Sequence, residues 1–183
     1  MTEIFGVPIQ ALMGQLMLGL VNGSFYAILS LGLAVIFGML NIVNFAHGAL
    51  YMVGAFFAWM LLNYAGINYW MALVIAPMGV ALIGVVIEKT MLRWLHQLDH
   101  LYGLLLTFGL ALILEGVFRE FYGSSGLPYE LPDVFRGVFD LGFMMLPKYR
   151  VWVIAVSIVL CFFTWFVIEK TKLGAYLDRK SVV

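Results

Sequence analysis

Formal charge is missing from most of the first half of the sequence: no Asp, Glu, Lys or Arg occurs between Ile4 and Ile87. The surface of a soluble domain needs solvated charges, so this stretch excludes a soluble domain. Over the whole chain 64% of residues are hydrophobic and 11% are charged, with a mean hydropathy of +1.03. In soluble domains about 45–50% of residues are hydrophobic and about 25% are charged. The composition is that of a membrane protein.

Other absences narrow the class of protein further. The single cysteine, Cys161, excludes an intramolecular disulfide, and we expect it to be a small buried hydrophobe. A net charge of zero argues against nucleic acid as a partner. No basic region precedes the first apolar run, so a cleaved signal peptide is not expected.

Motifs of the common active sites are missing as well. The sequence has no Gly-x-x-x-x-Gly-Lys loop, so we expect no ATP hydrolysis by this chain alone, and no Gly-x-Ser-x-Gly or His-Glu-x-x-His motif. His96 and His100 have the spacing of metal ligands, but they stand beside Arg93 and Asp99 without a third ligand. We therefore expect a solvated basic loop there, and neither a metal nor a cofactor.

Long apolar segments dominate what is present. Five of them approach the roughly 17–25 residues that a helix needs to cross a bilayer. They predict an all-α, polytopic transmembrane helical bundle in one domain, with spans near 10–37, 45–62, 70–87, 101–118 and 151–167.

The first span is longer than a hydrocarbon core of about 30 Å requires, so it must tilt, bend or emerge from the bilayer. Asn22, Gly23 and Ser24 are the expected weak point. Gly19, Gly23 and Ala27 recur every four residues and form a small-residue face for close helix packing. We expect packing within the chain, with a dimer contact as the alternative.

Basic residues indicate the topology. Lys89 and Arg93 lie in the short segment 88–100, and Lys170 and Lys172 follow the last span, so both segments favour the cytoplasm. Alternation of the spans then puts 38–44 inside, and 119–150 and the N-terminus outside. The outer segment predicts turns and a short hairpin around Val134–Phe135 and Val138–Phe139. It is either a structural cap or a docking surface.

Polar side chains gather at one place in the charge-free stretch, at Asn41, Asn44 and His47, with Tyr51 one helical turn later on the same face. Polar groups at membrane depth face protein, water or a substrate path. Segment 38–44 is either a loop or the break in a discontinuous helix. Three roles are open for these side chains: hydrogen bonds between helices, contact with a solute, and proton transfer by His47.

One carboxylate falls inside a predicted span. Glu115 lies near the outer end of its span, and Arg119 follows at i+4, the order that favours a helical ion pair. We interpret the pair as a local anchor at the membrane interface.

Three blocks of sequence, in order, resemble the permeases of branched-chain amino acid ABC transporters. They are Leu33-Ala34-Val35-Ile36-Phe37-Gly38 followed by the run from Asn41 to Ala55, then Leu104 to Gly116, and finally Thr171 to Tyr176. The first is highly specific and the other two moderately so. The resemblance extends to Leu177.

The resemblance implies a subunit of an importer in the bacterial inner membrane. Its expected partners are a second homologous permease, two cytoplasmic ATPases and an extracytoplasmic solute-binding protein, besides the lipid bilayer itself. Lys172, Leu173, Gly174, Ala175 and Tyr176 would begin the loop that couples to the ATPase. Asn41, Asn44, His47 and Tyr51 would line the substrate pathway.

The sequence departs from the family at its end. Family members continue through further spans, so residues 1–177 resemble about the first three-fifths of a permease. Residues 178–183 match the translation of a common sequencing adapter, and we expect a non-native tail there. Other functions remain open: a permease for urea, short amides or other amino acids, a non-transporting assembly subunit, and an intramembrane enzyme using His47.

Overall fold

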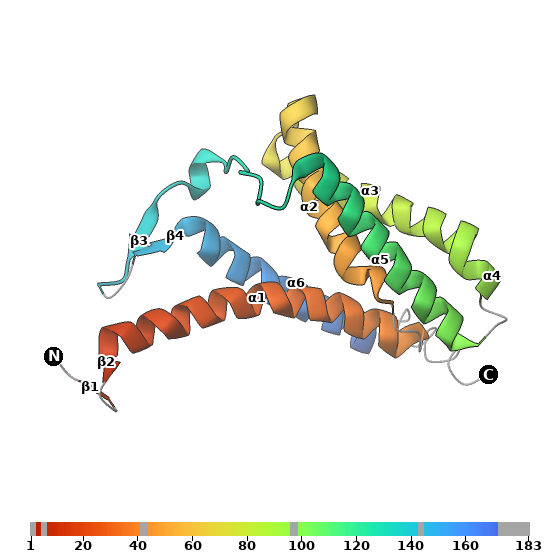
Figure 1. Cartoon of the computed structure of the whole chain (residues 1–183). Coiled ribbons are helices and arrows are strands. Elements are labelled where there is room, and N and C mark those ends of the chain that lie inside the picture. Colours follow the sequence, from red (N-terminus) through yellow and green to blue (C-terminus); the bar gives the residue numbers. More distant parts are fainter. Residues whose placement is uncertain (1–2, 5–6, 41–43, 96–98, 143–144, 172–183) are drawn as a thin grey trace. The chain divides into compact units, whose positions relative to one another are not determined.

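The computed structural model describes residues 3–4, 7–40, 44–95, 99–142 and 145–171. Long helices make up most of this part of the chain (Figure 1). They are α1 (Ile9–Leu40), α2 (Ala46–Ala65), α3 (Tyr69–Ile87), α5 (His100–Tyr122) and α6 (Lys148–Lys170). Each contains a window long and apolar enough to cross a membrane. The predicted all-α polytopic fold with five spans is confirmed.

Short elements complete the described chain. The π-helix η1 (Glu88–Leu92) and α4 (Arg93–Leu95) continue α3. Strand β1 (Glu3–Ile4) pairs with β2 (Val7–Pro8), and β3 (Val138–Asp140) pairs with β4 (Met145–Pro147), both antiparallel. The 3₁₀ helix η2 (Asp133–Phe135) precedes β3.

The chain divides into two compact units. One combines residues 1–31 with 131–183, and the other comprises residues 32–130. We call them the terminal unit and the central unit.

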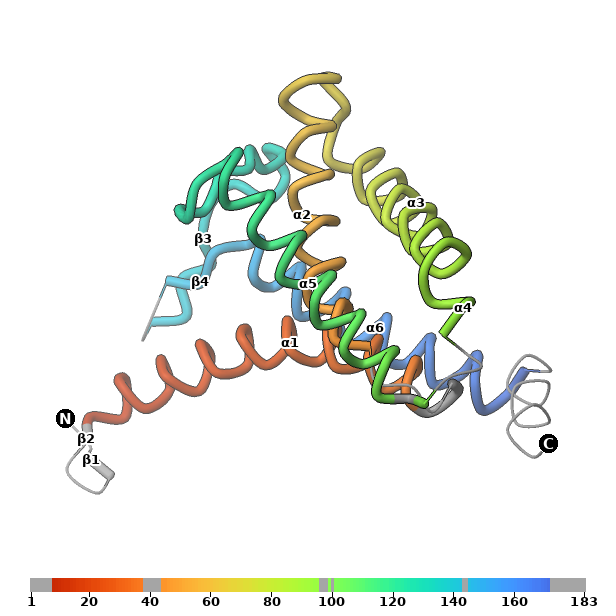
Figure 2. Tube along the Cα trace, turned by 45° about the vertical axis from the view of Figure 1, so that its right-hand side comes forward, coloured from red at the N-terminus to blue at the C-terminus, as the bar shows by residue number. Residues whose placement is uncertain are grey.

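In the central unit, α2 packs on both α3 and α5, as Figures 1 and 2 show. Only Gly66, Ile67 and Asn68 connect α2 to α3. Gly66 ends α2 in the left-handed region at φ 63°, and the Asn68 side chain accepts a hydrogen bond from Met71 N at 3.0 Å. Gly79 of α3 allows the ring of Phe57 to approach, since a Cβ there would clash with that ring.

In the terminal unit, α1 and α6 are joined by buried serines. Ser157 Oγ of α6 donates to the backbone oxygen of Ser24 at 2.9 Å, and Ser24 Oγ donates to Val21 O at 2.7 Å. The α1 helix runs unbroken past Asn22, Gly23 and Ser24. The apolar core here includes Val21, Val153 and Phe135.

Several predicted boundaries are wrong. Residues 38–40 are helical, so α1 continues past the predicted end of the first span at residue 37, into the segment predicted as a loop or a helix break. Residues 88–95, predicted as loop, are helical, because Glu, Lys, Met, Arg and Leu are good helix formers at the end of a span. Extension of α5 and the early start of α6 reduce the outer segment to 123–147. The hairpin there is confirmed, although Val134–Phe135 is 3₁₀ helix instead of strand.

A candidate site at the start of α2

Asn44 caps the start of α2. Its Oδ1 accepts a hydrogen bond from Ala46 N at 2.9 Å, and its backbone oxygen accepts one from His47 N at 3.2 Å. The first amides of a helix have no partner within the helix, and a side-chain oxygen just before it commonly supplies one. The amide oxygen of Asn44 is thus engaged in forming the end of α2.

Thr107 of α5 supplies a second acceptor at the same end. Phe45 N donates to Thr107 Oγ1 at 3.3 Å, and that hydroxyl donates to Leu104 O at 3.0 Å. The side chain is 1% exposed. The rings of Phe45 and Phe108 meet edge to face with centroids 6.1 Å apart, so α2 and α5 are joined here by both polar and aromatic contacts.

His47 lies against the backbone of α1. A Cβ on Gly32 would come within 2.7 Å of His47 Cε1 and 2.9 Å of His47 Nε2. Gly32 and His47 belong to the same unit. The half-buried imidazole therefore needs a residue without a side chain at position 32.

The structure shows no comparable contacts for the remaining predicted site residues that it describes. Tyr51 follows His47 by one turn and is exposed. Asn41 and Lys172, Leu173, Gly174, Ala175 and Tyr176 lie outside the described residues. Among the described residues, nothing lies within 4 Å of a Cβ built on Gly19 or Gly23, and Ala27 is half-buried.

Sequence reasoning missed Gly32 and Thr107. Thr107 had a signal, because it is the one hydroxyl in the apolar run from Leu104 to Phe108. A polar side chain in such a run needs a partner at membrane depth. Gly32 carried no such signal in the sequence, because it is one of 19 glycines and its neighbour is fixed only by tertiary packing.

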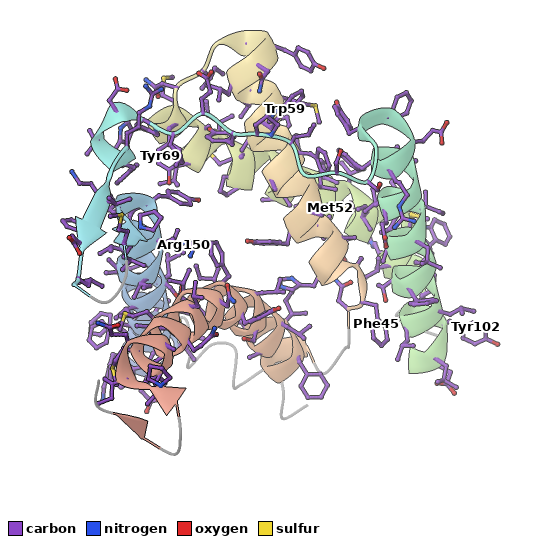
Figure 3. All side chains as sticks on the ribbon, turned by 60° about the vertical axis from the view of Figure 1, so that its left-hand side comes forward. Phe45, Met52, Trp59, Tyr69, Tyr102 and Arg150 are labelled. Carbon is purple, nitrogen blue, oxygen red and sulfur yellow. The ribbon has the colours of Figure 1, made fainter. Side chains whose placement is uncertain are left out.

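The other end of α2 is aromatic. Figure 3 shows Phe45 at the start of the helix and Trp59 farther along it. Phe56 packs on Phe118 and Tyr122 of α5, with centroids 4.7 and 5.1 Å apart. Trp59 contacts Tyr122 at 5.7 Å and donates from Nε1 to Pro128 O at 3.1 Å. Aromatic residues with one polar edge favour the membrane–water interface.

The segment after α5 is held at this aromatic end. Besides the Trp59 bond to Pro128, the ring of Tyr129 meets that of Tyr69 with centroids 6.2 Å apart. Partial burial, together with the neighbouring Tyr69 phenol, raises the pKa of Tyr129 above its ordinary value. The Tyr129 phenol is therefore neutral at physiological pH.

The predicted ion pair is confirmed. Arg119 Nη2 lies 2.6 Å from Glu115 Oε1 on the last turns of α5, with both side chains more than half exposed. His96 lies outside the described residues, and among the residues that the structure describes no group of three or more His, Cys, Asp or Glu side chains could hold a metal.

These features define a polytopic membrane protein in which Asn44, His47 of α2 and Thr107 of α5 gather at one helix end, where His47 packs against Gly32 of α1. Residues 15–178 match the family described as the branched-chain amino acid transport system permease component, and the chain belongs to this family. Family membership and the five apolar helices make it a multi-pass protein of the bacterial inner membrane.

Known relatives agree with the family. The chain is 26% identical over 171 residues to the high-affinity branched-chain amino acid transport permease BraD of Pseudomonas aeruginosa, covering 87% of this chain and 56% of that protein. It is 28% identical over 136 residues to LivH of Salmonella typhimurium and of Escherichia coli K12, covering 70% of this chain and 44% of each. The chain thus spans about half the length of these relatives. No solved structure matches it significantly.

Proposed function

We propose that the chain acts as the membrane-spanning permease subunit of a binding-protein-dependent ABC importer for branched-chain amino acids. The observation that carries this proposal is the family match over residues 15–178, together with relatives named as high-affinity branched-chain amino acid permeases. The chain forms a passive pathway, and ATP hydrolysis takes place on partner subunits.

The start of α2 is the proposed part of the solute path. Asn41, Asn44, His47 and Tyr51 are its polar side chains, and the exposed Tyr51 phenol is the most accessible of the described ones. Asn44 Oδ1 already accepts from Ala46 N, so its first role is to hold the helix end. Switching access between two sides requires an element with two arrangements, and this helix end, held by a few hydrogen bonds, is the one that we propose.

The proposed assembly contains a second homologous permease, two cytoplasmic ATPases and a solute-binding protein. Lys172 to Tyr176 would transmit ATP binding to the helices. The face made by Gly19, Gly23 and Ala27 would pack on a helix, and the space that the described residues leave open at Gly19 and Gly23 has room for one.

Reconstitution tests this function. The tagged chain is co-expressed with the ATPases, second permease and binding protein of its source genome, purified, and placed in liposomes. We expect co-purification of an ATPase, and ATP turnover and uptake of labelled leucine, isoleucine or valine that require the binding protein. If urea or a short amide stimulates ATP turnover and the three amino acids do not, that compound would be assigned as the solute. Neither ATPase binding nor uptake of any of these solutes would contradict the importer function.

A further inference from the structure

The hairpin β3–β4 is fixed to the outer end of α6. Strand β4 ends at Pro147 and α6 begins at Lys148, so no linker separates them. Lys148 N donates to Gly137 O at 3.1 Å. Phe135, just before the hairpin, is buried and stacks on Trp152 of α6 with centroids 5.2 Å apart. Hairpin and helix end therefore form one block, as Figure 1 shows.

The two faces of the hairpin differ. Phe139 pairs with Leu146, so both lie on one face, and Leu146 is buried. Val138, Met145 and Pro147 lie on the opposite face with Asp140. We call this the outer face. Val138 is 50% exposed and Met145 is 68% exposed, although the hairpin lies outside the apolar spans. On the other face Phe139 is 48% exposed, but its ring has Lys148 Nζ 5.7 Å from its centroid.

We propose that the outer face of this hairpin lies in the interfacial layer of the bilayer, in contact with lipid. The hairpin is attached to the first turn of a membrane-spanning helix, which fixes its depth near the lipid headgroups. That first turn and the next carry Lys148, Tyr149, Arg150 and Trp152. Aromatic and long basic side chains are the residue types found at this level of a membrane. Figure 3 shows Arg150 on this part of α6, beside the hairpin.

The polar groups of the hairpin set how deep it lies. A two-stranded sheet has two open edges, whose free amide and carbonyl groups cannot enter hydrocarbon. Asp140 also lies on the outer face, but its Oδ1 accepts from Gly142 N at 2.8 Å, at the turn end of the hairpin. Hydrated edges and apolar side chains on one face are best accommodated together in the interface, where apolar groups reach the acyl boundary and polar groups keep water.

Site-directed spin labelling tests this placement independently of transport. Because Cys161 is the single cysteine, a Cys161→Ala chain can carry one label at Val138→Cys or Met145→Cys. Asp133→Cys is the matched control, because Asp133 lies in the same unit, with 89% of its side chain exposed. The whole chain is reconstituted in nanodiscs of phosphatidylethanolamine and phosphatidylglycerol, and collision rates with oxygen and with a water-soluble nickel chelate are compared.

We expect labels at 138 and 145 to collide preferentially with oxygen, at depths up to about 5–10 Å below the headgroups, and the label at 133 to collide preferentially with the nickel chelate. Two variants report on the same face, so local disturbance by one substitution leaves the other to decide. Equal nickel access at 133, 138 and 145 would overturn the proposal. Shielding of 138 and 145 from both reagents would also overturn it, because protein would then cover the face.

Discussion

Three side chains around the start of α2 show how polar groups are accommodated among apolar helices. Asn44 caps the helix, Thr107 accepts from Phe45 N, and His47 packs where Gly32 leaves space. Among the described residues that are not exposed, no fully buried side-chain nitrogen or oxygen atom lacks a hydrogen-bond partner. At the residue scale, this helix end depends on a hydroxyl and on a missing Cβ.

Replacing Thr107 with Val should weaken this helix end. The change keeps the shape of the side chain but removes the acceptor of Phe45 N, so we expect a loss of about 1–2 kcal/mol in the free energy of unfolding. Thr107→Ser keeps the hydroxyl and is the matched control. Unfolding by SDS in mixed micelles measures the stability of both variants. Equal stability of the two variants would mean that the 3.3 Å contact contributes nothing.

Gly32→Ala should be destabilising, unlike a glycine change elsewhere in α1. Its Cβ would press on the His47 imidazole, and overpacking of this kind costs about 1–3 kcal/mol. Gly14→Ala is the control, because no described residue lies within 4 Å of its Cβ and alanine stabilises a helix interior by about 0.5–1 kcal/mol relative to glycine. Thermal unfolding in nanodiscs compares the two. The expectation fails if Gly32→Ala is as stable as Gly14→Ala.

At the scale of elements, hydropathy located each long helix in the described part of the chain but not all helix ends. Charged residues mark where a span leaves the hydrocarbon, and a helix can continue past that depth, as 88–95 does. Ends were better defined where a cap is encoded locally, as at Asn68 before α3. The contact of α6 with α1 at Ser24 could not be predicted, because it joins residues 133 positions apart.

For the candidate site, local pattern indicated a region and not its tertiary contacts, and its role in solute transport stays a prediction. The density of Asn and His in an apolar stretch located the start of α2. It could not identify Thr107 as a partner, because that hydrogen bond spans 62 positions of sequence. Local pattern finds where polar groups need partners, and tertiary packing decides which residues those partners are.

Trp59 should control the order of the segment after α5. Trp59→Phe keeps the ring but removes the Nε1 donor to Pro128 O, so we expect hydrogen exchange over residues 123–130 to accelerate about two- to tenfold. Trp94→Phe is the control, since Trp94 lies exposed on α4. Mass spectrometry of exchanged peptides measures the difference. Identical exchange in the two variants would assign the order of this segment to the Tyr69–Tyr129 contact alone.

For the whole molecule, the basic segments predict which side of the membrane each connection faces. In a Cys161→Ala chain, Ser125→Cys should react with an impermeant maleimide in intact cells, because it lies in the outer segment. Arg93→Cys should react only in inverted vesicles. Both side chains are exposed in the structure, so accessibility in the protein does not limit either reaction. The reverse pattern would invert the topology.

The three-residue connection between α2 and α3 has a consequence for biogenesis. Both helix ends at this turn are closed by the chain itself, through Gly66 and Asn68, and neither α2 nor α3 contains a formal charge. A pair of apolar helices joined this tightly can leave the insertion machinery as one hairpin, because no long polar segment between them has to be placed on the far side of the membrane. We expect α5 to join this preformed pair afterwards, with the Thr107 hydroxyl and the Phe108 ring as its first fixed points.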